Sequence, residues 1–191
     1  TAHTYLQGMT LTGGVADYSG GCMYAARTTQ VYNSTISGCV ATDAGAGIYA
    51  TDFSGTMPLD TVVMTGGATR NKNSLTGGLI HANSVKMKIV NSALSGGYAA
   101  KGGGMYVTGS DSAPSYFVNS TMKDCVAVNV GGGFFVEEND PATTTAADSE
   151  RGIFVTNPTL SGCKAYSGAG FYVTRGMVTV SGGTVNNNSA T

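Results

Sequence analysis

The sequence predicts an all-β protein: a right-handed, single-stranded parallel β-helix of about seven coils with about three short strands in each coil. Three observations lead to this prediction. The chain repeats itself about every 28 residues, and apolar and polar residues alternate within the repeat. The composition is also rich in glycine and poor in helix-forming residues. Gly accounts for 29 of 191 residues and Pro for only 4. Such self-similarity is typical of stacked arrays, in which each unit buries its face against its neighbours.

The first half of the repeat reads apolar-x-x-(Cys/Gly/Asn), and Thr or Ser flanks the apolar residue in most copies. This period-two alternation predicts a strand that points its apolar residue inward and its hydroxyl groups outward. The apolar residues are Leu11, Ile36, Met64, Leu94, Met122, Leu160 and Val185.

The second half of the repeat is a glycine pair followed by an apolar-aromatic step. One face of this strand should fill the coil interior, while the other face should present a column of rings. An exposed column of this size would be a large apolar patch. We expect a neighbouring subunit, a loop of the same chain or a stacked sugar chain to cover it. This candidate assembly or glycan-binding face consists of Tyr24, Tyr49, His81, Tyr106, Phe135 and Tyr172.

A third strand-like tract, seen at Met87 to Ile89 and at Ile153 to Val155, ends in a recurring asparagine. The asparagines could form an amide ladder along the stack. Alternatively, some carry glycans, because Asn33, Asn119 and Asn187 lie in Asn-x-Ser/Thr sequons. The ladder is the favoured interpretation, since two of its members lack a usable sequon. The ladder series is Asn33, Asn91, Asn119 and Asn157.

Cys39, Cys125 and Cys163 share one position of the repeat. We expect an internal stack of small apolar thiols there. A bridge between the last two stays open, because stacked positions fall within the Cα range of a disulfide but leave the Cβ atoms wide apart. Cys22 occupies a glycine position and is interpreted as a packing residue. No Cys-x-x-Cys pair exists, so neither a metal site nor a cofactor is predicted.

Composition excludes several classes of function. Charged residues make up 11% of the chain, its net charge is -1, and no basic cluster exists, so no nucleic-acid partner is expected. No apolar run approaches the length of a membrane helix, so no direct insertion is expected. An enzyme is not predicted, because His3 and His81 are isolated and the acids occupy different phases of the repeat. The repeat predicts one domain over residues 1–191, with loop insertions at 51–58, 68–76 and 137–151.

The outward hydroxyl residues of the first half-repeat form a Thr-x-Thr-like ladder, as in Thr10/Thr12 and Thr35/Ser37. Such a ladder resembles the arrays of ice-binding β-solenoids. Here the residues Val63, Ala93, Lys123 and Asn186 interrupt it. A solvated or O-glycosylated β-surface is therefore the ordinary interpretation, and ice binding is a weaker alternative.

The segment Val185 to Ala190 has the form apolar-x-x-Asn-x-Ala, and Gly-Gly-x-apolar-Tyr recurs along the chain. This repeat resembles that of the polymorphic outer membrane proteins of bacteria and of related β-helix surface proteins in protists. Most of the chain shares it, but Cys or Gly replaces the Asn in the other copies. The resemblance implies a surface β-helix that is adhesive or structural.

These observations predict a non-enzymatic extracellular or cell-surface protein that associates with itself, as the protomer of a filament or appendage. The chain begins and ends inside the repeat, so we expect a fragment or a processed product whose coil ends meet partners. An adhesin segment that binds glycans is the alternative, and a polysaccharide-active enzyme is a weaker one.

Overall fold

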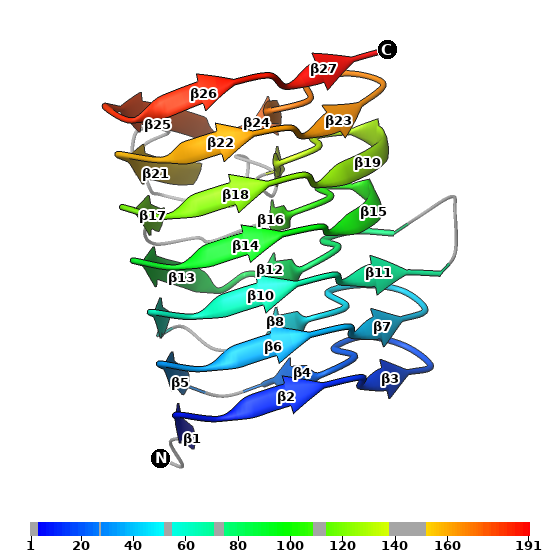
Figure 1. Ribbon diagram of the computed structural model, residues 1–191, viewed down its shortest axis with the longest axis vertical. Helices are drawn as coiled ribbons and strands as arrows, with labels where there is room; N and C mark the ends of the chain where they lie inside the picture. The colour runs from blue at the N-terminus through cyan, green and yellow to red at the C-terminus, as the bar shows by residue number, and fades with distance from the viewer. Residues whose placement is uncertain (1–3, 27, 52–54, 71–74, 109–113, 138–151) are drawn as a thin grey trace.

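The computed structural model describes residues 4–26, 28–51, 55–70, 75–108, 114–137 and 152–191 (Figure 1). These residues form a parallel β-solenoid of about six turns, and there is no helix among them. Every strand pairs in parallel with the equivalent strand of the next coil, and together the pairs make four sheets, here called A to D. The predicted all-β solenoid class is therefore confirmed.

Sheets A and B are formed by the two alternating tracts recognised in the sequence. Sheet A contains β1 (Thr4–Gln7), β5 (Thr29–Tyr32), β9 (Thr56–Asp60), β13 (Lys86–Val90), β17 (Ser115–Val118), β21 (Gly152–Thr156) and β25 (Met177–Ser181). Sheet B contains β2 (Thr10–Thr12), β6 (Thr35–Ser37), β10 (Val63–Thr65), β14 (Ala93–Ser95), β18 (Thr121–Lys123), β22 (Thr159–Ser161) and β26 (Thr184–Asn186).

Sheet D is formed by the aromatic tract, and sheet C lies between it and sheet B. Sheet C contains β3 (Val15–Ala16), β7 (Val40–Ala41), β11 (Ala68–Thr69), β15 (Tyr98–Lys101), β19 (Val126–Val130), β23 (Lys164–Ala165) and β27 (Ser189–Ala190). Sheet D contains β4 (Met23–Ala25), β8 (Ile48–Thr51), β12 (Ile80–Asn83), β16 (Met105–Thr108), β20 (Phe134–Glu137) and β24 (Phe171–Arg175).

The prediction of three strands per coil is wrong, because a full coil has four. The missed strands are those of sheet C, and five of them, such as Val15–Ala16 and Val40–Ala41, are only two residues long. A two-residue strand carries no alternation that a sequence pattern could reveal. Two expected insertions are also shorter than predicted, since residues 56–58 belong to β9 and 68–69 to β11. Residues 138–151 of the third insertion lie outside the described residues.

The corners of the coil explain the recurring Gly and Asn. The three corners that join sheets A to B, B to C and C to D each use a residue with positive φ in every coil, a conformation that Gly adopts freely and Asn tolerates better than most residues. The corner between sheets A and B uses Gly8, Asn33, Thr61, Asn91, Asn119, Asn157 and Gly182. The corner between sheets B and C uses Gly13, Gly38, Gly66, Gly96, Asp124, Gly162 and Asn187. The corner between sheets C and D uses Gly20, Gly45, Gly77, Gly102, Gly131 and Gly168.

Two glycines separate the effect of backbone strain from the effect of crowding. Gly66 and Gly102 have φ of 64° and 62°, but a Cβ on Gly66 would meet nothing within 4 Å, whereas one on Gly102 would lie 2.6 Å from the Met105 carbonyl oxygen. Gly66→Ala should cost about 1–2 kcal/mol of unfolding free energy, from the left-handed conformation alone. Gly102→Ala should cost more, because the backbone must also shift. Urea unfolding of both variants measures the difference, and equal losses would contradict the crowding argument.

The interior of the coil is filled by the apolar residues of all four sheets. Five of the seven marker residues predicted to point inward, Ile36, Met64, Leu94, Met122 and Leu160, are at most 1% exposed. Aromatic rings cross the middle of the coil: Phe117 of sheet A meets Phe134 of sheet D edge to face at 5.1 Å, and Phe134 stacks on Phe171 at 5.2 Å. Burial of these residues against neighbouring coils is what holds the stack together.

A buried serine row, which the sequence analysis missed, ties the corner between sheets A and B along the stack. The hydroxyls of Ser34, Ser92 and Ser120 each donate to the carbonyl two residues earlier, at 2.7 Å. Each hydroxyl also accepts from a backbone N–H of the preceding coil, as in Val62 N to Ser92 Oγ at 3.0 Å. The row satisfies backbone groups that would otherwise be buried without a partner.

Candidate functional site

The six predicted aromatic residues form one continuous column on the outward side of sheet D. The backbone partners along this sheet place them in register from β4 to β24. Successive ring centroids are separated by 5.2 Å (Tyr24–Tyr49), 4.9 Å (Tyr49–His81), 4.8 Å (His81–Tyr106), 4.9 Å (Tyr106–Phe135) and 5.5 Å (Phe135–Tyr172). Contacts at these separations stabilise aromatic pairs beyond the effect of area burial alone.

The exposure of the column differs from the expectation. Tyr24 is 57% exposed, but His81, Tyr106 and Phe135 are 9%, 7% and 1% exposed. A single copy of the chain therefore already buries the middle of the column, so of the three expected covers the chain itself, and not a neighbouring subunit or a sugar, accounts for these three rings. Only the two ends of the column remain accessible. Tyr24 is exposed at one end with the half-buried Tyr49 beside it, and Tyr172 is half-buried at the other end.

Hydrogen-bonding and charged side chains contact the buried rings. The Thr76 hydroxyl lies 2.6 Å from Nδ1 of His81, and the Tyr106 hydroxyl donates to the carboxylate of Glu137. The Lys101 ammonium group lies over the Phe135 ring, 5.3 Å from its centroid. These contacts join the column to the adjoining corner and to the end of β20, as expected of a packed structural element.

The two titratable groups in the middle of the column stay neutral near pH 7. Burial lowers the pKa of His81 to about 4, although the hydrogen bond at Thr76 opposes the shift. Burial, followed by the hydrogen bond and charge of Glu137, raises the pKa of the Tyr106 phenol well above its usual range. Neither group is poised for proton transfer at neutral pH.

The asparagines of the predicted ladder lie at exposed corners and all have positive φ. Among them, the Asn157 amide donates to the Asn119 carbonyl at 3.2 Å, whereas Asn91 instead donates to Asp60 at 3.3 Å. The corner conformation therefore accounts for the recurrence of Asn more fully than amide pairing does. The sequon residues Asn33, Asn119 and Asn187 are exposed, and their glycosylation stays a prediction.

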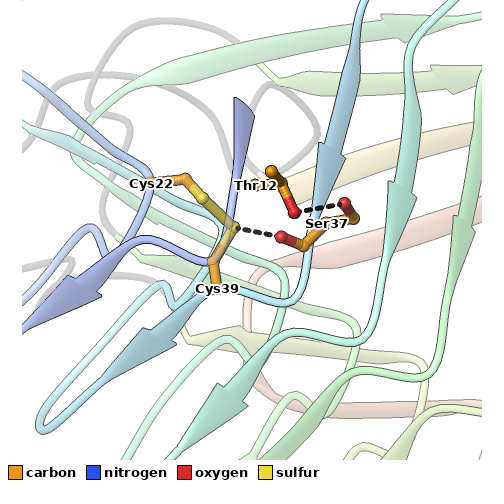
Figure 2. The surroundings of a disulfide bond; sticks show 4 residues. All are labelled: Thr12, Cys22, Ser37 and Cys39. Atoms are coloured by element: carbon orange, nitrogen blue, oxygen red, sulfur yellow. Dashed lines mark hydrogen bonds between the residues drawn. A yellow bond between two sulfur atoms is a disulfide. The ribbon is translucent and has the colours of Figure 1, made fainter. Parts of the chain in front are cut away.

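A disulfide joins Cys22 to Cys39, so the interpretation of Cys22 as a packing residue is wrong (Figure 2). Cys22 precedes β4 in the first coil, and Cys39 lies at the corner after β6 in the second coil. The bond crosses between these two corners with a Cα–Cα distance of 5.5 Å. Beside it, the Ser37 hydroxyl donates to Thr12 Oγ1 of the first coil at 3.2 Å (Figure 2).

Cys125 and Cys163 are free and fully buried on adjacent coils, as the thiol stack predicts. The stack does not include Cys39, because that residue is bridged and because Gly67 and Gly97 occupy the equivalent position in the two intervening coils. The Cys125 sulfur lies 3.2 Å from the Lys123 carbonyl oxygen and 3.5 Å from the sulfur of Met122. The hydrogen bond to Cys163, followed by burial, raises the pKa of the Cys125 thiol well above its usual value. Cys125 is thus an inert packing thiol at neutral pH.

The two terminal coils expose side chains that point into the coil interior. Val180 and Val185 of the last coil are 42% and 48% exposed, although they pair in register with Val155 and Leu160, which are 0% exposed. Leu6 and Leu11 in the first coil are likewise only partly buried. Each end therefore presents apolar surface together with a row of unpaired backbone groups on every strand.

Among the described residues no three His, Cys, Asp or Glu side chains come together in a way that could hold a metal ion. In the part of the chain that the structure describes, no helix is long and apolar enough to cross a membrane. No protein-family model, curated protein or solved structure matches this chain.

Proposed function

We propose that the chain is a non-enzymatic structural protein of the extracellular space or cell surface, and that copies join end to end through their terminal coils into a filament. The observation that carries this proposal is the exposure of inward-pointing side chains at the ends. Val185 is 48% exposed, whereas Leu160, its partner one coil earlier, is 0% exposed. A second copy stacked on this coil would bury Val185 as Leu160 is buried.

The geometry of such a contact favours a fibre. The two ends of a parallel solenoid are different surfaces, so contact between them is head-to-tail and has no built-in closure. Each added copy presents the same free end again, and open filaments result. A right-handed coil with seven turns is part of this proposal, since parallel strand connections are right-handed in the great majority of cases.

The disulfide supports the proposed location. Disulfides persist in oxidising compartments and are rare where thiols are kept reduced. The Cys22–Cys39 bond fits a protein that works outside the cytosol. The free Cys125 and Cys163 do not conflict with this, because both are buried away from oxidants.

The aromatic column is not part of the proposed interface, which differs from our expectation. Its buried middle leaves little surface for a lateral neighbour, so the column is an internal support of sheet D and the coil ends are the interface. Glycan binding, the alternative function, is favoured only at the ends of the column, by the exposed Tyr24 and the half-buried Tyr49 and Tyr172, because sugar cannot stack on rings that are already covered.

Charged substitutions in the last coil test the proposal. Val180→Lys and Val185→Lys should abolish concentration-dependent assembly, because a buried ammonium group without a partner is costly at the junction. Both residues are exposed enough in the single chain for the fold to survive. Thr179→Lys is the matched control, since Thr179 lies on the same strand but points outward. Size-exclusion chromatography with light scattering reports mass, and circular dichroism reports folding.

The wild-type chain and Thr179→Lys should form large species, while Val180→Lys and Val185→Lys should remain monomeric and folded. A wild-type chain that stays monomeric at all concentrations would refute the end-to-end assembly.

A further inference from the structure

The outward face of sheet B is the most regular surface of the described structure. Its seven strands pair without a single register shift, so the same two positions of every strand line up along the stack. Figure 1 shows these strands one above another on the side facing the viewer. One rank is Thr10, Thr35, Val63, Ala93, Thr121, Thr159 and Thr184. The other rank is Thr12, Ser37, Thr65, Ser95, Lys123, Ser161 and Asn186.

The chemistry of this face is uniform. Thr and Ser fill most positions, all side chains except Lys123 are short, and every position is exposed or half-exposed. The outward face of sheet A differs, because it mixes charged Asp60 and Lys88 with the bulky rings of Tyr116 and Phe154. Only sheet B combines short side chains of similar length with a nearly uncharged surface. A complementary ligand must therefore be uncharged, flat and itself periodic.

The spacing of the hydroxyl groups follows from the fold. Adjacent strands lie about 4.8 Å apart, and outward residues along one strand lie about 6.6 Å apart, twice the rise per residue of a parallel strand. These repeats lie close to the two repeat distances of water oxygens on a prism face of hexagonal ice. One pair of neighbouring hydroxyls shares a hydrogen bond, since Ser37 Oγ donates to Thr12 Oγ1 at 3.2 Å. The remaining hydroxyl capacity points to water, which a regular array holds in an ordered layer.

We propose that the outward face of sheet B binds the surface of ice. The residues of the two ranks that are neither Thr nor Ser weaken the array less than the sequence pattern indicates, because the strands that carry them stay in register with their neighbours. Val63 and Ala93 occupy one rank beside the hydroxyls of Thr65 and Ser95 in the other. Their short apolar groups keep the face flat. Lys123 is the one residue that projects a charge from it, and it lies in a single strand of the seven. This proposal does not depend on whether the chain assembles into filaments.

Ice-crystal shape and thermal hysteresis of the purified chain test the proposal. Thr65→Tyr should remove most of the hysteresis, because a large ring in the centre of the face holds the remaining hydroxyls away from the crystal. Thr156→Tyr is the matched control, since Thr156 points outward from sheet A. Lys123→Thr should increase the hysteresis above the wild-type value, because it removes the charge and makes the second rank an unbroken row of hydroxyls from Thr12 to Ser161. Circular dichroism and thermal unfolding confirm that each variant is folded.

Faceted crystals with the wild-type chain, a loss confined to Thr65→Tyr and a gain in Lys123→Thr would support the assignment. Crystals that grow as in buffer with the wild-type chain would overturn it. So would equal losses in Thr65→Tyr and Thr156→Tyr, since these would show that the effect does not come from sheet B.

Discussion

Removal of the Cys22–Cys39 disulfide is expected to lower the free energy of unfolding by about 3 kcal/mol, the value for a cross-link that closes a loop of this size. The bond spans 17 residues in sequence and ties the first coil to the second. Among the described residues the strands of the first coil pair only with those of the second, so in a single copy they depend most on such a constraint. The double variant Cys22→Ala/Cys39→Ala should therefore unfold at a lower urea concentration.

Reductant provides the control for this prediction. It should destabilise the wild-type chain to the level of the double variant and leave the double variant unchanged. Both proteins contain Cys125 and Cys163, so any effect through those thiols would appear equally in both. Hydrogen exchange should show the loss of protection first in β1 to β4. A wild-type chain whose stability is indifferent to reductant would mean that the bond contributes nothing.

Acidification is expected to destabilise the chain through His81. Its folded pKa is about 4, below the 6.5 of an unperturbed histidine, so between these values the unfolded state binds the extra proton. The stability contribution is therefore complete above pH 6.5 and is lost as pH falls toward 4. The shift corresponds to about 3 kcal/mol at most. Urea unfolding from pH 7.5 to pH 4 measures the loss.

His81→Phe isolates this effect, because Phe keeps a ring in the column between Tyr49 and Tyr106 but cannot bind a proton. Carboxylates titrate in both proteins, so the difference between wild-type and variant stability reports His81. As pH falls from 6.5 to 4, the free energy of unfolding of the wild-type chain should decrease more than that of the variant. Parallel pH profiles for the two proteins would show that His81 is not buried in the neutral form.

The repeat pattern predicted the parts of the fold that depend on local alternation. The inward residues of sheet B and the outward aromatic column of sheet D follow from side-chain periodicity. These features are local to a few residues, and stacking repeats them. The same reasoning failed for sheet C, where strands such as Val40–Ala41 are too short to show a period.

Interactions that cross the coil were not predictable in this way. Stacking places residues of equal phase together, and it directed attention to Cys125 and Cys163, whereas the observed bond joins Cys22 and Cys39 from two different corners. The burial of Phe135 likewise depends on what lies outside sheet D, which a strand pattern does not describe. Which residues meet across the coil depends on the shape of its cross-section. That shape cannot be predicted without the number of strands per turn.

Cryo-electron microscopy of the wild-type chain tests the central claim, that terminal coils join copies into a structural filament. The expected result is a rod in which strands continue across each junction at the spacing of about 4.8 Å found within a sheet, with Val180 and Val185 buried against the next copy. Single particles no longer than the solenoid of about six turns, at every concentration examined, would contradict the claim.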